Sequence, residues 1–287
     1  MFTYDHNSNS TNPNNQIWYT SSDGMIVTPY DSSAFGVSIV SNTYSEDKGV
    51  IVFSDDVHYI DYKAFYNRTS LTSIIIPDGV TSIGDWAFRS CSSLESITIP
   101  ESVTNIGDYA FANCSSLISV NIPDNLTEIG EYAFLGCNNL PIYKYIRYAD
   151  TYAVSTSSNK NTYSFKPGTR FIGNSFTYNN RLLTSIEIPE GVIFVGDGAF
   201  ANCSQLTTVT LPSSIIKIGN HAFFNIASIS LVCKATIPPL LGGDMFSSIL
   251  SLNKLTIYVP KESVDSYKSH AGWSDYADRI FEISPYI

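Results

Sequence analysis

The chain has 287 residues, of which 44% are hydrophobic and 15% charged, a composition typical of an ordered protein with a neutral polar surface. Its net charge of −10 excludes an ordinary nucleic-acid-binding surface, because no stripe of Lys and Arg is present to neutralise phosphates. No apolar run approaches the roughly 18 to 20 residues of a membrane-spanning helix, so we expect no direct membrane insertion of this chain.

The first part of the chain is polar and then alternating. Residues 1–16 are rich in Asn and Ser and are expected to form a disordered leader, because they offer little apolar surface to pack. They also lack the basic and apolar segments of a secretory signal peptide. In residues 17–56, apolar and polar residues alternate in two stretches. We expect these stretches to pair as strands and to form an N-terminal β cap.

A repeat of 23 residues dominates the chain after this cap. Prolines recur at this interval at Pro77, Pro100 and Pro123, and again at Pro189 and Pro212. A fixed period of this length is typical of a solenoid, which we place at residues 57–260. In one copy, the apolar positions of the repeat are Val80, Ile83, Ala87, Phe88, Cys91, Leu94, Ile97 and Ile99.

Each repeat predicts the same local structure. The segment LESITIP at 94–100 alternates, which indicates a short strand with Ile97 facing inward and with Ser96 and Thr98 facing outward. Gly84 predicts a tight turn whose backbone conformation only glycine adopts at low cost. The residues after it form a short helical or irregular arc, in which Phe88 would stack on the equivalent ring of the next repeat.

The full pattern is L-x-x-I-x-I-P-x-x-V-x-x-I-G-x-x-A-F-x-x-C-x-x-L. It occurs at 71–94, 94–117, 117–140 and 183–206, with a degraded copy at 206–223. It resembles the leucine-rich repeat of the BspA-like class, which is found in surface proteins of bacteria and some protozoa. The resemblance implies a leucine-rich repeat solenoid of short β-strands and a non-catalytic, adhesin-like binding protein that is displayed on the cell surface or secreted.

The repeat becomes irregular over residues 141–168, where tyrosines accumulate. Tyr143, Tyr145 and Tyr148 are candidates for partner binding, because exposed tyrosine is a favoured contact residue at interfaces. In the alternative interpretation, these residues, with Tyr152 and Tyr163, fill core positions that Ile and Leu have vacated. The sequence leaves both interpretations open.

The last segment, residues 261–287, predicts a C-terminal helical cap. Val264, Tyr267 and Trp273 would be the apolar contacts of its helix. Such a cap would cover the open edge of the solenoid and prevent strand addition there.

No motif in the chain predicts chemistry. The four histidines show no metal-ligand spacing, and nucleotide-binding or nucleophile motifs are missing from the sequence. Cys91, Cys114, Cys137 and Cys203 occupy one repeat position, which predicts buried free thiols rather than a metal or redox site. Carboxylates such as Asp85 also recur at one repeat position, so any proximity between them would follow from the stacking of the repeats and not from an acid–base pair. We therefore expect no enzymatic activity, no cofactor and no bound metal.

The outward face of the repeated strands is the candidate binding surface, and its residues are mostly small and polar. Such a shallow surface suits a protein or a glycan better than a small molecule. A rim of carboxylates at Asp78, Glu101, Asp124 and Glu190 would favour a basic partner. The candidates are Ser73, Ile75, Ser96, Thr98, Ser119, Asn121, Ser185, Glu187, Thr208 and Thr210.

Two other functions remain as alternatives at this point. The solenoid could be a structural spacer that presents another domain, which would require no binding at the strand face. An enzyme site in the tyrosine-rich section is the third hypothesis, although Asp150 is the only carboxylate close to those tyrosines in the sequence.

Overall fold

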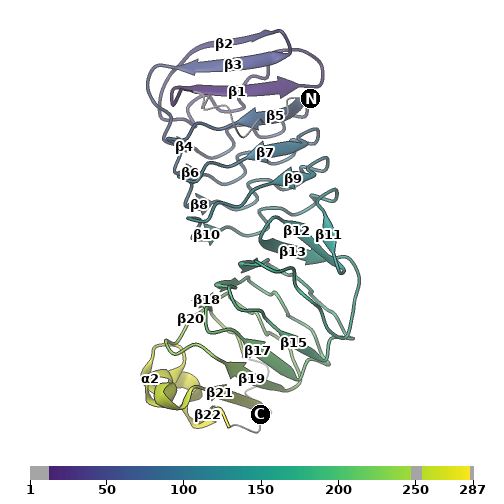
Figure 1. The fold of residues 1–287 in the computed structure, drawn as a ribbon, viewed down its shortest axis with the longest axis vertical. Helices are drawn as coiled ribbons and strands as arrows, with labels where there is room; N and C mark the ends of the chain where they lie inside the picture. Colours follow the sequence, from purple (N-terminus) through teal and green to yellow (C-terminus); the bar gives the residue numbers. More distant parts are fainter. Residues whose placement is uncertain (1–12, 247–253, 285–287) are drawn as a thin grey trace. The chain divides into compact units, whose positions relative to one another are not determined.

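The computed structural model describes residues 13–246 and 254–284 (Figure 1). The expected leader therefore lies largely outside the described residues. Contacts divide the chain into two compact units, residues 1–140 and 141–287, which we call the first and second unit. Within the described ranges, both units are built from short strands and turns, and the α-helix α2 (Val264–Ser269) lies near the C-terminus. No helix in these ranges has the length and apolarity needed to span a bilayer.

The first unit begins with a β cap that continues into the repeats. Within residues 13–140, one sheet has the strand order β2-β3-β1-β5-β7-β9. Strand β1 pairs antiparallel with both β3 and β5, and from β5 onward the strands are parallel (Figure 1). The strands are β1 (Gln16–Ser21), β2 (Ile39–Ser45), β3 (Lys48–Phe53), β5 (Leu71–Ile75), β7 (Ser96–Thr98) and β9 (Ser119–Val120).

The boundary of the leader differs from the prediction. Residues 13–16 belong to the edge of the fold, since β1 begins at Gln16 and the carbonyl of Asn15 accepts the N–H of Phe53 at 2.9 Å. The side chain of Asn14 also accepts the N–H of Gly79 at 3.1 Å. Asparagine supplies hydrogen bonds instead of apolar contacts here, which a composition argument about packing does not detect.

The first unit also contains a second sheet, in which all strands are parallel. It contains β4 (Tyr59–Ile60), β6 (Ser82–Ile83), β8 (Asn105–Ile106) and β10 (Glu128–Ile129). Each repeat adds one strand to each sheet, and apolar side chains fill the space between them. The expected phenylalanine stack is present, with Phe88, Phe111 and Phe134 buried and their ring centroids 5.2 to 5.3 Å apart.

The turn that recurs in each repeat requires glycine, but not for the backbone conformation that the sequence predicted. Gly107 has no positive φ, so its backbone does not require glycine. Instead, a Cβ atom there would lie 2.6 Å from the backbone nitrogen of Asp85 in the preceding turn, which is closer than real Cβ contacts come. The positive φ falls two residues later, at Tyr109, where the sequence gives no glycine signal.

The second unit has the same two-sheet construction. Its first sheet opens with an antiparallel meander of β11, β12 and β13, and then continues in parallel. The irregular section is thus partly regular structure. The strands are β11 (Ile142–Tyr143), β12 (Ile146–Ala149), β13 (Tyr152–Thr156), β14 (Phe171–Ile172), β16 (Phe194–Val195), β18 (Lys217–Ile218) and β20 (Leu240–Leu241).

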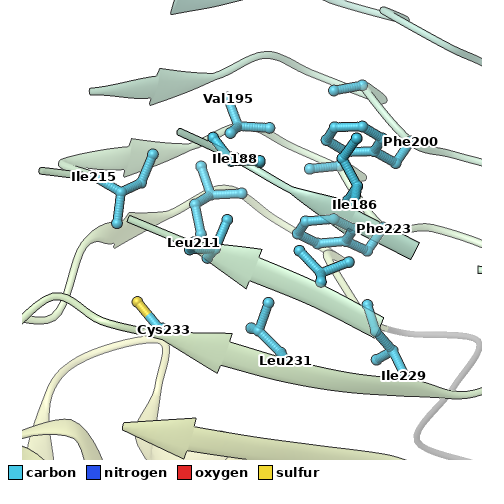
Figure 2. Packing of buried hydrophobic residues seen from close by; sticks show 14 of the residues in the cluster. Ile186, Ile188, Val195, Phe200, Leu211, Ile215, Phe223, Ile229, Leu231 and Cys233 are labelled. Carbon is cyan, nitrogen blue, oxygen red and sulfur yellow. The ribbon is translucent and has the colours of Figure 1, made fainter. Parts of the chain in front are cut away.

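The other sheet of the second unit is parallel throughout and carries the inward side chains of the core. Figure 2 shows Ile186 and Leu231 of this sheet packed with Phe200 and Phe223, whose rings stack at 5.6 Å. Its strands are β15 (Ser185–Glu187), β17 (Thr208–Leu211), β19 (Ile229–Cys233), β21 (Leu255–Val259) and β22 (Ile280–Glu282).

The C-terminal cap has the predicted contacts. Tyr267 of α2 and Trp273 are fully buried, and Val264 packs against the same core. Their polar atoms are satisfied, since the Tyr267 hydroxyl donates to the carbonyl of Ala235 at 2.9 Å and the Trp273 indole donates to that of Pro239 at 2.7 Å.

Candidate functional site

The strand face of the first unit has the predicted alternation. Ile97 and Val120 point inward and are buried, whereas Ser96, Thr98 and Ser119 are exposed. The parallel register aligns these positions across strands, with Ser73 beside Ser96 and Ser96 beside Ser119, so equivalent side chains form continuous rows.

Two of the candidates on this face have structural roles. The hydroxyl of Ser73, which is half-buried, lies 2.6 Å from that of Thr20 on β1. Asn121 clamps two turns together, because its amide oxygen accepts the N–H of Ile99 and its amide nitrogen donates to the carbonyl of Ile99, both at 2.7 Å. The more accessible part of the face is therefore formed by Ser96, Thr98 and Ser119.

The edge of this face carries carboxylates. Asp78, Glu101 and Asp124 are exposed just beyond the strand ends, and the Glu101 carboxylate accepts the N–H of Asp124 at 3.0 Å. The surrounding unit is strongly acidic, because residues 1–140 contain 16 Asp and Glu against four Lys and Arg. Residues 141–287 contain 10 Asp and Glu against 12 Lys and Arg. The net charge of −10 thus conceals a formal charge of −12 on the first unit.

The strand face of the second unit presents Ser185, Glu187 and Thr208 as exposed residues, with Thr210 half-buried. The Glu187 carboxylate lies 3.7 Å from the Lys234 ammonium group. A hollow of about 360 Å³ adjoins this ion pair. It is lined by Thr162, Tyr163, Ser164, Phe165, Glu187, Ile188, Pro189, Glu190 and Lys234.

Sequence reasoning missed an aromatic extension of this face. Tyr258 of β21 is aligned with Phe281 of β22, and their ring centroids lie 6.3 Å apart. Phe281 is 50% exposed. The repeat pattern is degraded in this part of the chain, so the outward position of these residues follows from strand register and not from motif matching.

The tyrosine-rich section contains both exposed tyrosines and tyrosines that fill the core. Tyr143 and Tyr145 are exposed, at 36% and 50%. Tyr148 is only 2% exposed, so its prediction as a partner-binding residue was wrong. It fills the core because its hydroxyl is satisfied there, accepting the N–H of Lys166 at 2.9 Å and the Thr169 hydroxyl at 3.3 Å. Burial raises the pKa of the Tyr148 hydroxyl.

The remaining tyrosines of this section, Tyr152 and Tyr163, are also buried. Tyr163 donates its hydroxyl to the carbonyl of Ser158 at 3.0 Å. The tyrosines whose polar atoms find partners inside the unit therefore fill the core, whereas Tyr143 on β11 and Tyr145 in the turn before β12 are exposed.

The cysteines are buried and free, as predicted. Each thiol of the repeat position donates to a carbonyl of the preceding turn, for example Cys91 to Phe65 at 3.1 Å and Cys203 to Thr177 at 3.2 Å. Burial raises the pKa of Cys91 to about 12 and that of Cys203 to about 11. Protonated, enclosed thiols are poor nucleophiles and poor metal ligands.

The recurring carboxylates also have a structural use. The Asp85 side chain accepts the backbone N–H of Asp108, and that of Asp108 accepts the N–H of Glu131. Among the described residues, no group of three or more His, Cys, Asp or Glu could hold a metal ion.

The BspA type leucine rich repeat region matches residues 39–166 and 170–271 in six copies. The chain belongs to this family. Members of the BspA type leucine-rich repeat family are generally modules for protein interaction. No protein with a curated description matches the sequence.

Several solved bacterial leucine-rich repeat structures are similar to this BspA type chain. A leucine-rich repeat protein of T. pallidum has 20% identity and a TM-score of 0.35, over 85% of this chain and 97% of that one. A leucine-rich cell surface protein of Faecalibacterium prausnitzii has 27% identity and a TM-score of 0.33, over 62% and 64%. A leucine-rich repeat protein of Bacteroides ovatus has 21% identity and a TM-score of 0.29, over 86% and 92%.

Proposed function

We propose that this protein is a non-catalytic, adhesin-like module that binds a basic protein through the strand face of its first unit. The observation that carries the proposal is the charge of this unit, 16 acidic against four basic residues, combined with exposed carboxylates at the ends of the strands. A partner with a basic surface would be attracted to this edge and would then lie across Ser96, Thr98 and Ser119.

The shape of the surface supports a macromolecular partner. Short side chains in aligned rows make a shallow face, whereas small-molecule sites are concave and enclose most of their ligand. Carboxylates at the rim of an interface act mainly on the rate of association and on the choice of partner. Binding should therefore weaken as ionic strength rises.

We also propose that the protein acts at the cell surface or after secretion, where an adhesin-like module meets its partners. This part of the proposal rests on the membership of the BspA type family, and not on any feature of the chain's termini.

The test uses the immobilised full-length chain and purified proteins of opposite charge, lysozyme and lactoferrin as basic probes and serum albumin as the acidic control. The variant Glu101→Lys/Asp124→Lys reverses two rim charges. The matched control, Glu46→Lys/Asp47→Lys, makes the same charge change in the turn between β2 and β3, where both residues are exposed. Binding is measured by surface plasmon resonance at two salt concentrations.

We expect saturable binding of a basic probe, with an association rate about tenfold lower in the rim variant than in the control variant. Equal rates in both variants would show that the unit attracts basic proteins only through its total charge. Absence of saturable binding would favour the spacer function over the binding module.

A further inference from the structure

A column of aromatic rings runs along the turns that follow β4, β6, β8 and β10 in the first unit. Tyr66, Trp86, Tyr109 and Tyr132 occupy successive turns, with ring centroids 6.1, 5.8 and 5.3 Å apart. All four are half-buried, and Tyr30, which is 52% exposed, extends the column at 5.3 Å from Tyr66. We call these five residues the aromatic column.

The backbone of the column is unfavourable for the residues it carries. Trp86, Tyr109 and Tyr132 have φ values of 61°, 53° and 54°, in the left-handed region that bulky residues rarely adopt. The equivalent positions of the second unit include Gly198 and Ser175, also at positive φ. The turn therefore accepts small residues, and aromatic residues there cost stability without being required by the fold. Such strain often accompanies a functional surface.

Positive charge gathers on the same column. Three of the four Lys and Arg residues of the first unit lie over its rings. The guanidinium carbon of Arg89 is 4.0 Å from the Trp86 ring centroid, and the Lys63 ammonium group is 5.3 Å from it. The guanidinium carbon of Arg68 is 5.4 Å from the Tyr30 ring. Among residues 13–140, none of the three cations lies within 4.0 Å of a carboxylate.

We propose that the aromatic column, with Lys63, Arg68 and Arg89, binds an acidic glycan. A guanidinium stacked on an aromatic ring keeps its N–H edge available for a carboxylate or a sulfate group. Sugar rings present apolar C–H faces to aromatic side chains and hydroxyl groups to tyrosine hydroxyls. A polymer of repeating sugars also matches a surface that repeats one ring per turn.

A glycan fits this surface better than an acidic peptide does. Peptides that lie along repeated backbone usually gain affinity from main-chain hydrogen bonds. Here the N–H groups of Trp86 and Tyr109 already donate to the carbonyls of Asp108 and Glu131 in the following turns, each at 2.8 Å. A ligand must therefore be recognised through side chains alone. This surface lies on the turns and not on the strands, and its cations lie over aromatic rings, so the inference goes beyond the proposed function.

The experiment uses the full-length chain with chondroitin sulfate and polygalacturonate as acidic glycan probes. Dextran is the neutral control and poly-glutamate the acidic peptide control. Binding is followed by tryptophan fluorescence, because Trp86 lies in the column, whereas Trp273 is buried and Trp18 lies on β1, outside the column. The signal is assigned to the column with Trp86→Phe.

Two pairs of variants test the site. Lys63→Gln/Arg89→Gln removes two cations of the column, and Lys48→Gln removes the remaining cation of the first unit, which also lies over a tryptophan. Tyr109→Asn removes a ring while keeping a residue that tolerates positive φ. Its matched control is His221→Asn, at the equivalent position of the second unit, where φ is 54°. Circular dichroism confirms that each variant is folded.

We expect an acidic glycan to bind saturably, with about tenfold or weaker affinity in the Lys63→Gln/Arg89→Gln and Tyr109→Asn variants and less than twofold change in the two controls. Tighter binding of poly-glutamate than of either glycan would assign the column to an acidic peptide and overturn the proposal. Binding of neither glycan, or equal binding by all variants, would also overturn it.

Discussion

The Asp85 carboxylate accepts the backbone N–H of Asp108, one turn later, with an oxygen to nitrogen distance of 2.8 Å. The same contact recurs in the second unit, where the side chain of Asn174 accepts the N–H of Asp197 at 3.1 Å. A side-chain acceptor at this position thus satisfies a backbone donor that neither sheet reaches. The charge of the acceptor is not essential, because Asn occupies the position in two turns, at Asn174 and Asn220.

The effect of replacing Asp85 on stability should therefore depend on whether the new side chain can accept a hydrogen bond. We expect Asp85→Ala to lower the free energy of unfolding by about 1 kcal/mol, since the N–H of Asp108 loses its partner. Asp85→Asn should stay within about 0.5 kcal/mol of the wild type. Urea denaturation of both variants measures the difference. Equal destabilisation by Ala and Asn would mean that the carboxylate acts through its charge.

Close packing of turns predicts different outcomes for two glycines. A Cβ atom at Gly219 would lie 2.6 Å from the backbone nitrogen of Asp197, whereas a Cβ atom at Gly243 would lie 3.7 Å from the side-chain oxygen of Asn220. Neither residue has a positive φ. We expect Gly219→Ala to cost about 1 to 3 kcal/mol through overpacking and Gly243→Ala to be neutral or slightly stabilising. Thermal unfolding of the two variants measures this, and similar melting temperatures would contradict the role of close approach.

Repetition explains which parts of the structure could be predicted. The inward position of Ile97, the stack that contains Phe111 and the burial of Cys114 each recur in several copies, so independent copies of one pattern support each assignment. Tyr148 occurs once. Its burial depends on hydrogen-bond partners that are 18 and 21 residues away in the chain, and no local pattern identifies them.

The aromatic column was hidden for a related reason. Trp86 and Tyr109 stand at a position that the repeat leaves variable, and their positive φ is one that aromatic residues disfavour. Propensity therefore argues against the observed conformation. A count of charges for each half of the chain would have revealed the acidic first unit. The positions of Arg89 and Lys63 over the Trp86 ring, in contrast, arise only when the turns fold.

Two substitutions test the inward and outward assignment of side chains. Phe111 is fully buried between Phe88 and Phe134, so Phe111→Ala should cost about 3 to 5 kcal/mol. Thr98 is exposed, and Thr98→Ala should change the free energy of unfolding by no more than about 0.5 kcal/mol. Chemical denaturation provides both values, and equal shifts would refute the assignment.

The buried thiols predict low reactivity in the native protein. Burial raises the pKa of Cys91 to about 12, so the reactive thiolate is scarce at pH 8, and enclosure also blocks access. We expect a thiol reagent to modify none of the five cysteines rapidly in native protein and all five in urea. Rapid modification of even one native thiol would show that its turn opens readily.

The same raised pKa predicts a loss of stability in alkali. An unfolded thiol titrates near pH 8.5, whereas folded Cys91 keeps its proton up to about pH 12. Between these values the folded state binds more protons than the unfolded state, so stability falls as pH rises, by about 1.4 kcal/mol per pH unit for each such thiol. Cys91→Ala should make this slope shallower by the contribution of one thiol, about 1.4 kcal/mol per pH unit. The destabilisation caused by the cavity that the substitution leaves does not depend on pH. Unfolding measured from pH 8 to pH 11 gives the slope, and an unchanged slope in Cys91→Ala would contradict the assigned burial of the thiol.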